Sequence, residues 1–534
     1  MTSFLDAVGY GDWILHALIW LPAAGAGLVL ASGETHARKI AGWLAGLLFV
    51  LSLGLWWAFD PAGGMQMESS LAWIPAWGVS YSLGIDGISL FMVMLTTFSS
   101  LVAVVGSFNY IRDRQRGFYA LMLMLQGAVV GVFTASDLLL FYIFFELTLV
   151  PMYFIVGVWG GERRVYAAIK FFLYTAFGSL LMLVAILYLG FTANEQLGVA
   201  TFAYDDFLRL DLSLTEQLWL FSAFAIAFGV KVPVFPLHTW LPDAHVEAPT
   251  PGSVILAAVL LKVGTFGFVR FLLPLFPLAA QHGTVTTVML ALAVVGIVYT
   301  AWVAAVQPDA KKLVAYTSVA HMGFVVLGVF ALTTTGIQGG MVVMISHGIS
   351  TGALFLLLGM LYERRATRRI DAFGGLARVA PLLATAFVIT ALASIGLPGT
   401  SGFVGEFLAL LGAFERHPWF AGIATLGVIF AAYYMLPMVQ RIFFNELSEP
   451  ANGRIPDLSR RELAILAPMC ALMIWIGVQP GPMLERMEPS VRAVVERVES
   501  GTVGGPADGG PLAEVETVEE SADSNVTDTS NPDF

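Results

Sequence analysis

The chain has 534 residues, of which 57% are hydrophobic and only 12% are charged, and its mean hydropathy is +0.79. This composition excludes an ordinary soluble globular enzyme of this length and predicts a polytopic membrane protein. The net charge of -11 is a local property, because most of the excess acid lies after residue 485.

Apolar runs long enough to cross about 30 Å of hydrocarbon, roughly 20 residues each, recur along nearly the whole chain. The first run lacks a basic leader and a small-residue cleavage site, so it is predicted to be a retained helix. Fourteen spans are predicted, near residues 12–32, 40–60, 84–106, 117–135, 138–159, 166–192, 216–241, 252–273, 284–306, 312–332, 338–361, 380–414, 419–441 and 463–483.

Lys and Arg concentrate in the odd-numbered loops between these spans, for example at 112–116, 160–164, 309–312 and 363–369. Short cytoplasmic loops carry an excess of these residues, so the odd loops are expected to be cytoplasmic. With fourteen spans, both termini would face the periplasmic side of a cell inner membrane.

Six ionisable side chains fall inside the predicted spans, where a charge costs roughly 2.5 to 3.5 kcal/mol on insertion scales. Their order is acid, base, base, imidazole, imidazole, acid. A series of this kind, held at one depth and wetted by internal water, can pass protons. The candidate proton-pathway residues are Glu146, Lys231, Lys262, His321, His347 and Glu406.

These residues also have a purely structural interpretation. The first acid and lysine could form one buried ion pair, the two histidines could be neutral core residues, and the other two could reach an interface. Asp86 and Asp137 lie near predicted helix ends and fit helix caps as well as pathway members. The occurrence of six such residues together favours the pathway.

The seventh and twelfth spans are predicted to be interrupted. Residues 227–253 contain five prolines beside Lys231, and Pro398 with several glycines precedes Glu406. Proline breaks a helix, and the freed carbonyls are tolerated at membrane depth only inside protein or beside a watery cavity. Paired broken helices in corresponding halves of a chain indicate an ion site.

One spacing relates the two halves of the chain. Glu146 and Lys231 are 85 residues apart, and so are His321 and Glu406. Because five helices separate the copies, successive copies run in opposite directions, which predicts two inverted five-helix repeats. The predicted organisation is helices 1–3 at 1–116, repeats at 117–273 and 284–441, helix 14 at 463–484, and an acidic disordered tail at 485–534.

The polar stretch after the seventh break holds two supporting candidates, His238 and Asp243, but no spacing typical of a metal site. The single cysteine, Cys470, lies in the last span, which excludes an internal disulfide and a thiolate-bound cluster. No glycine-rich nucleotide loop in a βαβ context is evident. We therefore predict no metal and no cofactor in this chain.

Long motifs covering about residues 80–445 resemble the antiporter-like membrane subunits of respiratory complex I, in particular those of the chain M type. They include "FFELTLVPMYFIVGVWGG", "KVPVFPLHTWLPDAHVEAPTPGSVILAAVLLKVGTFG" and "GLPGTSGFVGEFLALLGAF". The resemblance implies that Glu146 and Lys231 pair in a first half-channel and that Lys262 and His321 bridge to the second. It places His347 on the central axis and makes Glu406 the terminal protonatable residue.

The resemblance also implies a function: proton pumping coupled to quinone reduction elsewhere in an NADH:quinone oxidoreductase, with no redox chemistry in this chain. The implied partners are chain L-like and chain N-like subunits and the lipid bilayer, and not nucleic acid. Sodium/proton antiporter subunits of the Mrp type are the alternative, although they and the L and N chains generally carry lysine where this chain has Glu406. A standalone antiporter and a structural membrane spacer stay open.

Overall fold

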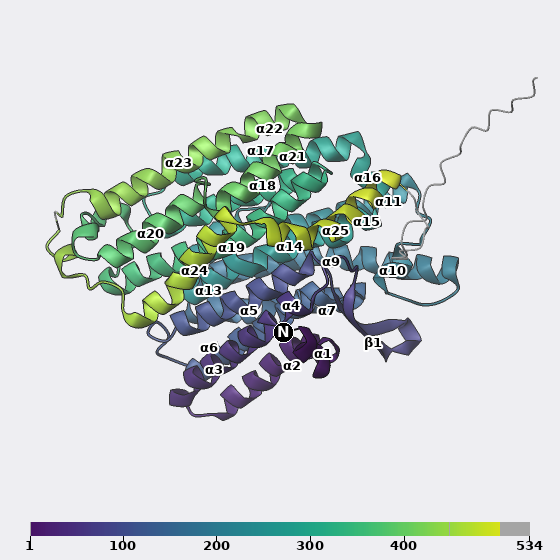
Figure 1. The fold of residues 1–534 in the computed structure, drawn as a ribbon, viewed down its shortest axis with the longest axis horizontal. Coiled ribbons are helices and arrows are strands. Elements are labelled where there is room, and N and C mark those ends of the chain that lie inside the picture. Colours follow the sequence, from purple (N-terminus) through teal and green to yellow (C-terminus); the bar gives the residue numbers. More distant parts are fainter. Residues whose placement is uncertain (1, 448, 502–534) are drawn as a thin grey trace, which may run out of the picture.

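Long apolar helices dominate the computed structural model, which describes residues 2–447 and 449–501 (Figure 1). In that part, twelve helical stretches are long and apolar enough to cross a membrane, and each coincides with a predicted span. The unbroken ones are α2 (Tyr10–Ala31), α5 (Ser89–Gly106), α6 (Gln115–Thr134), α9 (Arg164–Leu197), α17 (Gly283–Ala305), α18 (Ala310–Phe330), α19 (Thr334–Arg365) and α24 (Arg460–Val478).

The other four stretches are composed of shorter consecutive helices. The π-helical turns η2, η3 and η6 occur within two of them. The first two stretches are α3 (Glu34–Leu53) with α4 (Leu55–Ala58), and α7 (Leu138–Leu147) with α8 (Leu149–Trp159). The third consists of α13 (Thr250–Ile255), η2 (Leu256–Leu260), α14 (Leu261–Gly267), η3 (Phe268–Leu272) and α15 (Leu273–Leu275). The fourth consists of α22 (Pro418–Ala424), α23 (Leu426–Val439) and η6 (Gln440–Phe444).

The two remaining predicted spans are interrupted, as expected. One consists of α11 (Leu214–Lys231) and α12 (Trp240–Glu247), and the other of α20 (Pro381–Ser394) and α21 (Ser401–Arg416). The predicted breaks in helices 7 and 12 are thereby confirmed. The total of fourteen crossings and the inverted relation of the two halves stay predictions.

The first break ends α11 at Lys231 and leaves a backbone carbonyl without a helical partner. The helix starts at a capping box formed by Ser213 and Glu216. At its other end, the indole Nε1 of Trp240 in α12 donates to the carbonyl oxygen of Val230 at 2.8 Å. The aromatic side chain after the break therefore satisfies a polar group that the break exposes, as burial requires.

The second break depends on glycine. Gly396 has φ +73° and Gly399 has φ +88°, which lie in the left-handed region that favours glycine. A Cβ atom at Gly396 would also lie 2.9 Å from the Oε2 atom of Glu406. This glycine lets the broken backbone approach a buried carboxylate.

Two helical stretches form the centre of the bundle. In Thr250–Leu275 and in α19, the most apolar segment of 18 residues is entirely buried. The first stretch carries Lys262, and α19 carries His347. Outer helices such as α9 expose large apolar side chains, among them Phe177 and Phe191. This arrangement suits an outer surface in contact with lipid and an interior that holds the polar groups.

A β-hairpin lies before α5 and was not predicted. Strands β1 (Gln66–Ile74) and β2 (Val79–Ile85) pair in antiparallel fashion. The third span therefore begins at Ser89 and not near residue 84. The shorter helical elements are α1 (Thr2–Ala7), η1 (Pro75–Trp77), α10 (Tyr204–Phe207), α16 (Pro277–Gln281), η4 (Ile370–Ala372), η5 (Leu376–Arg378) and η7 (Asn452–Arg454).

The prediction of a disordered tail from residue 485 is wrong for its first part, because Gly481–Ser500 forms the helix α25. Its apolar side chains, including Met487, Val491 and Val498, recur at helical spacing and are buried on one face. Arg497 fixes the helix to the bundle by donating to the carbonyls of Leu208 and Pro274. Residues 502–534 lie outside the described part of the chain.

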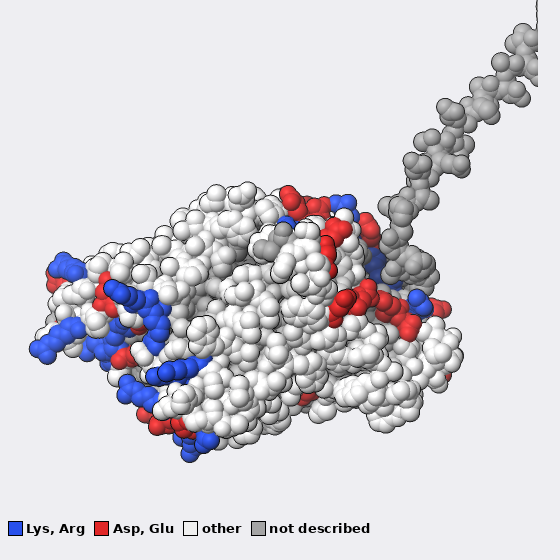
Figure 2. Space-filling view, turned by 60° about the horizontal axis from the view of Figure 1, so that its bottom comes forward, with Lys and Arg blue, Asp and Glu red and all other residues white. Residues whose placement is uncertain are grey.

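Lys and Arg gather mainly at one end of the molecule in Figure 2. A cavity lined by Arg163, Lys311 and Arg368 brings three of the odd-numbered loops together, and a neighbouring pocket adds Arg38 and Arg112. We call the surface around these five residues the basic face. It is the surface that the positive-inside rule assigns to the cytoplasm.

Replacing Trp240 by Phe removes the donor to the Val230 carbonyl and leaves that group buried without a partner. We expect a loss of about 1–3 kcal/mol of stability, the usual desolvation cost of such a group. The measurement is thermal unfolding of the purified assembly. Trp219→Phe, at a side chain that is 76% exposed, is the matched control and should leave the transition unchanged. Equal shifts for the two variants would contradict the role of Trp240.

Candidate functional site

Lys231 lies at the carboxyl end of α11, where the helix dipole favours a cation, and its side chain is buried with 1% exposure. Its Nζ lies 3.4 Å from the Oγ1 atom of Thr148, and 5.0 Å from the ring centre of Phe145. The ammonium group is thus surrounded by a hydroxyl and aromatic faces. A cation held in this way keeps part of its stabilisation without a carboxylate.

Glu146 is the expected partner of Lys231, but the two side chains make no direct ion pair in the described structure. Glu146 is half-buried near the end of α7, and its Oε1 atom is buried without a hydrogen-bond partner. The two groups still interact through space. The structure therefore shows this pair in an open arrangement.

Lys262 and His347 form a second buried contact of the site. The Nζ atom of Lys262 lies 2.7 Å from Nδ1 of His347 and 2.5 Å from the carbonyl oxygen of Ala257. The π-helical turn η2, which includes Ala257, immediately precedes the helix that carries Lys262. Such turns alter the regular backbone pairing of a helix and are frequent at functional sites.

His321 and Glu406 extend this contact into the second half of the chain. The Nδ1 atom of His321 lies 2.8 Å from Oε1 of Glu406, and both side chains are buried. The rings of His321 and His347 lie 5.7 Å apart between centroids, edge to face. Lys262, His347, His321 and Glu406 therefore form one continuous line, which we call the central polar line.

A small internal cavity borders this line. Its lining includes His321, His347 and Glu406 together with Ser346 and Ser394, and it has room for about one water molecule. The Nε2 atom of His347 is buried without a protein partner. Imidazoles, hydroxyls and a carboxylate around a space of this size are suited to relay a proton through one water.

The first half of the chain meets the central polar line where α11 packs on α14. A Cβ atom at Gly264 would lie 3.0 Å from the Cβ of Lys231, so the two helices touch at this point. Lys262 is two residues away from that glycine. The two lysines therefore belong to adjacent helices in direct contact, although no hydrogen bond joins them in the described residues.

Two further residues belong to the site and were not predicted as members. His245 in α12 is fully buried, neither of its ring nitrogens has a partner among the described residues, and its ring stacks on Phe355 at 4.5 Å. The lysines whose charges reach it are Lys262 and Lys311. The sequence had shown His245 in a polar stretch without metal spacing, and Lys311 as one of two lysines in a loop.

Lys311 lies at the basic face. Its side chain is 8% exposed, and its Nζ donates to the carbonyl oxygen of Ala248 at 2.6 Å. The same side chain lines a cavity of about 300 Å³ on the basic face, beside Glu247 and Arg368.

The two supporting candidates do not join the central polar line. Asp243 pairs with Lys170 of α9 at 2.8 Å, and His238 stacks on Phe235. Asp137 is the N-cap of α7, where it accepts from two backbone amides, whereas Asp86 precedes the N-cap of α5, accepts from the amide of Ser89 and pairs with Arg270. The interpretation as a helix cap is confirmed for Asp137.

No group of three or more His, Cys, Asp or Glu side chains in the described residues is placed to hold a metal ion. Cys470 is a free, partly buried thiol in α24 and packs against the core. The polar chemistry of the described site is therefore carried by lysine, histidine, carboxylate and hydroxyl groups.

Replacing Gly396 by Ala should disturb Glu406 without removing it. The new Cβ would meet Oε2 of Glu406, and a left-handed backbone costs a non-glycine residue roughly 1–2 kcal/mol. We expect proton translocation to fall severalfold. Translocation is measured in vesicles by dye quenching. Gly422→Ala, in a helix where a Cβ meets nothing within 4 Å, is the control. Normal translocation in both variants would argue against a role for this contact.

Comparison with known proteins identifies the family of the chain. The family model described as "NADH:quinone oxidoreductase/Mrp antiporter, TM" matches residues 135–431. NADH-quinone oxidoreductase subunit M of Rhodobacter capsulatus is 45% identical, over 90% of this chain and 96% of its own length.

Solved structures give the same assignment. A chain of the respiratory complex I from Thermus thermophilus is 36% identical, with a TM-score of 0.83 over 92% of this chain and 100% of that one. A chain of the Mrp complex from Dietzia sp. shares the fold, with a TM-score of 0.76 over 91% of this chain and 52% of that one, at only 22% identity. The Mrp alternative is thus a distant relative. The chain belongs to the NADH:quinone oxidoreductase/Mrp antiporter family of membrane proteins, on the branch of the complex I subunit M proteins.

Proposed function

We propose that this chain translocates protons as a membrane subunit of an NADH-quinone oxidoreductase, with the central polar line as its path. The observation that carries the proposal is the unbroken set of contacts Lys262–His347–His321–Glu406 in the buried centre of the bundle. Four titratable groups in sequence, next to a cavity that holds a water, have the chemistry of a proton relay.

Electrostatic coupling would move protons along this path. At an effective dielectric constant of about 20, two unit charges attract or repel by roughly 4 kcal/mol at 4 Å and by half as much at 8 Å. Closing or opening the Glu146 and Lys231 pair therefore changes the proton affinity of Lys231 by more than a factor of ten. Its altered charge acts in turn on Lys262 across the contact between α11 and α14.

Protons would enter from the basic face and leave beyond Glu406. The cavity that contains Lys311 opens at that face, and His245, whose two ring nitrogens are buried without a partner in the described residues, would carry the proton from there toward the central polar line. This direction agrees with a cytoplasmic basic face and with both termini on the periplasmic side of the inner membrane. In the proposed path, each half of the chain contributes one broken helix, and the two halves would be related as inverted repeats.

The energy source lies outside the chain in this proposal. Electron transfer to a quinone elsewhere in the complex would shift the Glu146 and Lys231 pair, and chain L-like and chain N-like subunits would flank this one in the membrane. The chain itself binds no redox cofactor. Any conformational part of the coupling needs a free-energy difference between two states of the pair.

The open Glu146 and Lys231 pair also weighs against a purely structural spacer. A buried charge pair that only held helices together would be closed, because leaving one partner unpaired costs 3–5 kcal/mol. Instead, Lys231 is held by Thr148 and aromatic rings. This arrangement suits a charge that changes partners during a cycle.

Replacing Lys231 by Ala separates a proton pump from a spacer. We expect the complex to assemble normally and to lose most of its quinone reductase activity and proton translocation, because the first half-channel loses its switching charge. Assembly is measured by native gel electrophoresis, and both activities in membrane vesicles. Lys39→Ala, at an exposed lysine of α3, is the control. Loss of assembly with normal activity in the residual complex would favour the spacer.

Replacing Lys311 by Met tests the entry route from the basic face. We expect proton translocation to fall several-fold, and the loss to be larger at high external pH, where proton supply limits the rate. Translocation is followed as a pH profile in inside-out vesicles, which expose the basic face to the medium if that face is cytoplasmic. Lys312→Met, at the adjacent residue outside the cavity lining, is the matched control. Identical pH profiles for the two variants would exclude Lys311 from the path.

A further inference from the structure

An apolar groove runs along the outside of α24, apart from the central polar line. It has a volume of about 750 Å³ and lies between α24 and the pair of helices α3 and α5. Phe49, Phe98, Ile465 and Leu472 form its walls, Trp475 lies toward one end and Arg461 toward the other. Along α24, Arg461 and Trp475 are about 21 Å apart at 1.5 Å per residue.

These dimensions fit an acyl chain. One leaflet of the hydrocarbon core is about 15 Å thick, half of the 30 Å total. A groove of roughly 21 Å that follows a membrane-spanning helix is long enough to hold a chain from the headgroup boundary to the middle of the bilayer. Its walls carry aromatic and branched apolar side chains, and its charged residue lies at one end only.

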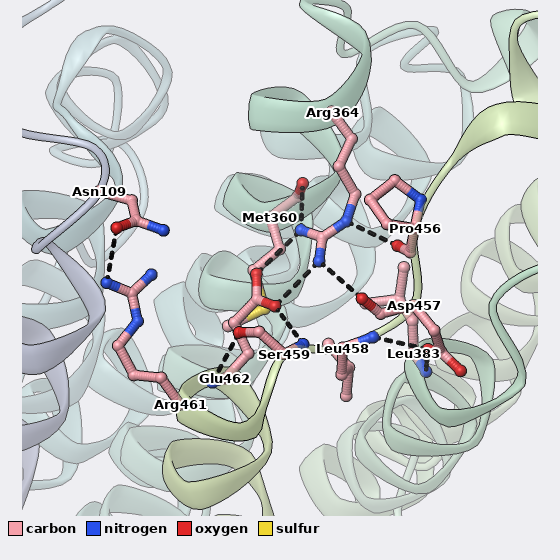
Figure 3. A network of polar contacts seen from close by, with 10 residues as sticks. All are labelled: Asn109, Met360, Arg364, Leu383, Pro456, Asp457, Leu458, Ser459, Arg461 and Glu462. Carbon is pink, nitrogen blue, oxygen red and sulfur yellow. Dashed lines mark hydrogen bonds and ion pairs between the residues drawn. The ribbon is translucent and has the colours of Figure 1, made fainter.

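The arginine at the charged end of the groove has a different kind of partner from the arginine of the neighbouring ion pair. Figure 3 shows Arg364 bonded to both carboxylate oxygens of Glu462 and to the carbonyls of Met360, Pro456 and Asp457. Arg461, next to Glu462 in sequence, instead donates to the neutral amide oxygen of Asn109 at 3.0 Å. Among the described residues, Arg461 has no carboxylate partner.

Two more arginines lie near the Arg461 end of the groove. Arg38 and Arg112 line the pocket that contains Asn109, the partner of Arg461. Glu363 is the one acidic residue that lines the same pocket, and Arg112 and Arg461 both lie within its electrostatic reach. Three arginines against one glutamate leave an excess of positive charge at the basic face.

We propose that this groove is a binding site for an anionic phospholipid, whose acyl chain lies along α24 and whose phosphate is bound by Arg461 with support from Arg38 and Arg112. Guanidinium groups bind phosphate through two parallel hydrogen bonds, and basic pockets between helices on the cytoplasmic side attract anionic headgroups. A zwitterionic lipid fits the groove equally well but gains less at its headgroup.

The site is tested in the assembled complex with photoactivatable phosphatidylglycerol and phosphatidylcholine that carry the same acyl chain. Labelled peptides are mapped by mass spectrometry. We expect phosphatidylglycerol to label α24 and α5 more than phosphatidylcholine does. Arg461→Gln should lower that labelling about fivefold, equivalent to roughly 1 kcal/mol for one basic residue near a headgroup. Arg460→Gln, at an exposed arginine outside the groove lining, is the matched control.

A second variant tests the apolar part independently of charge. Ala471→Phe fills the groove and should lower labelling by both lipids, even if Arg461→Gln fails to assemble. Equal labelling by the two lipids in the unaltered complex would overturn the proposal. So would equal effects of Arg461→Gln and Arg460→Gln, undiminished labelling of Ala471→Phe, or crosslinks from the groove to a neighbouring subunit in place of lipid.

Discussion

The contact between Lys262 and His347 is the constraint on which the rest of the interior depends. A buried ammonium group costs several kcal/mol, and in the described residues Lys262 has an imidazole and a backbone carbonyl as partners, and no carboxylate. The surrounding elements supply these partners. The η2 turn brings the Ala257 carbonyl, and the buried helix α19 brings the histidine. The chain thus places its most costly group where the protein, and not lipid, can solvate it.

The two broken helices solve a second problem, which is how to place charged groups near exposed backbone at membrane depth. In the first break the indole of Trp240 satisfies a free carbonyl, and in the second a left-handed glycine lets the backbone pass close to Glu406. Lys231 ends the helix before one break, and Glu406 lies in the second turn after the other. Lys231 therefore has the helix end that suits its sign, whereas Glu406 lies beyond the first turn, where the helix dipole acts most strongly. The first break relies on an indole hydrogen bond and the second on a left-handed glycine, and each places a charged side chain close to the broken backbone.

Much of the fold was predictable because lipid imposes strong and simple rules. Hydropathy located all twelve long spans, and proline located both breaks. The hairpin and α25 were missed for physical reasons. Their surfaces are only partly apolar, and each is ordered by contacts with distant segments, such as the bonds from Arg497 to Leu208 and Pro274. Rules based on continuous apolar length carry no information about such elements.

The sequence by itself determined which groups had to be special, since a charge inside an apolar run has few explanations, and it identified the six candidates inside the spans and the family. Only the tertiary structure decided how they connect. It joins Lys262 to His347 and His321 to Glu406, leaves Glu146 apart from Lys231, and buries His245 and Lys311, which were not among the candidates. The reason is that proton transfer depends on distances of a few ångströms between side chains on different helices. Those distances follow from helix packing and not from spacing along the chain.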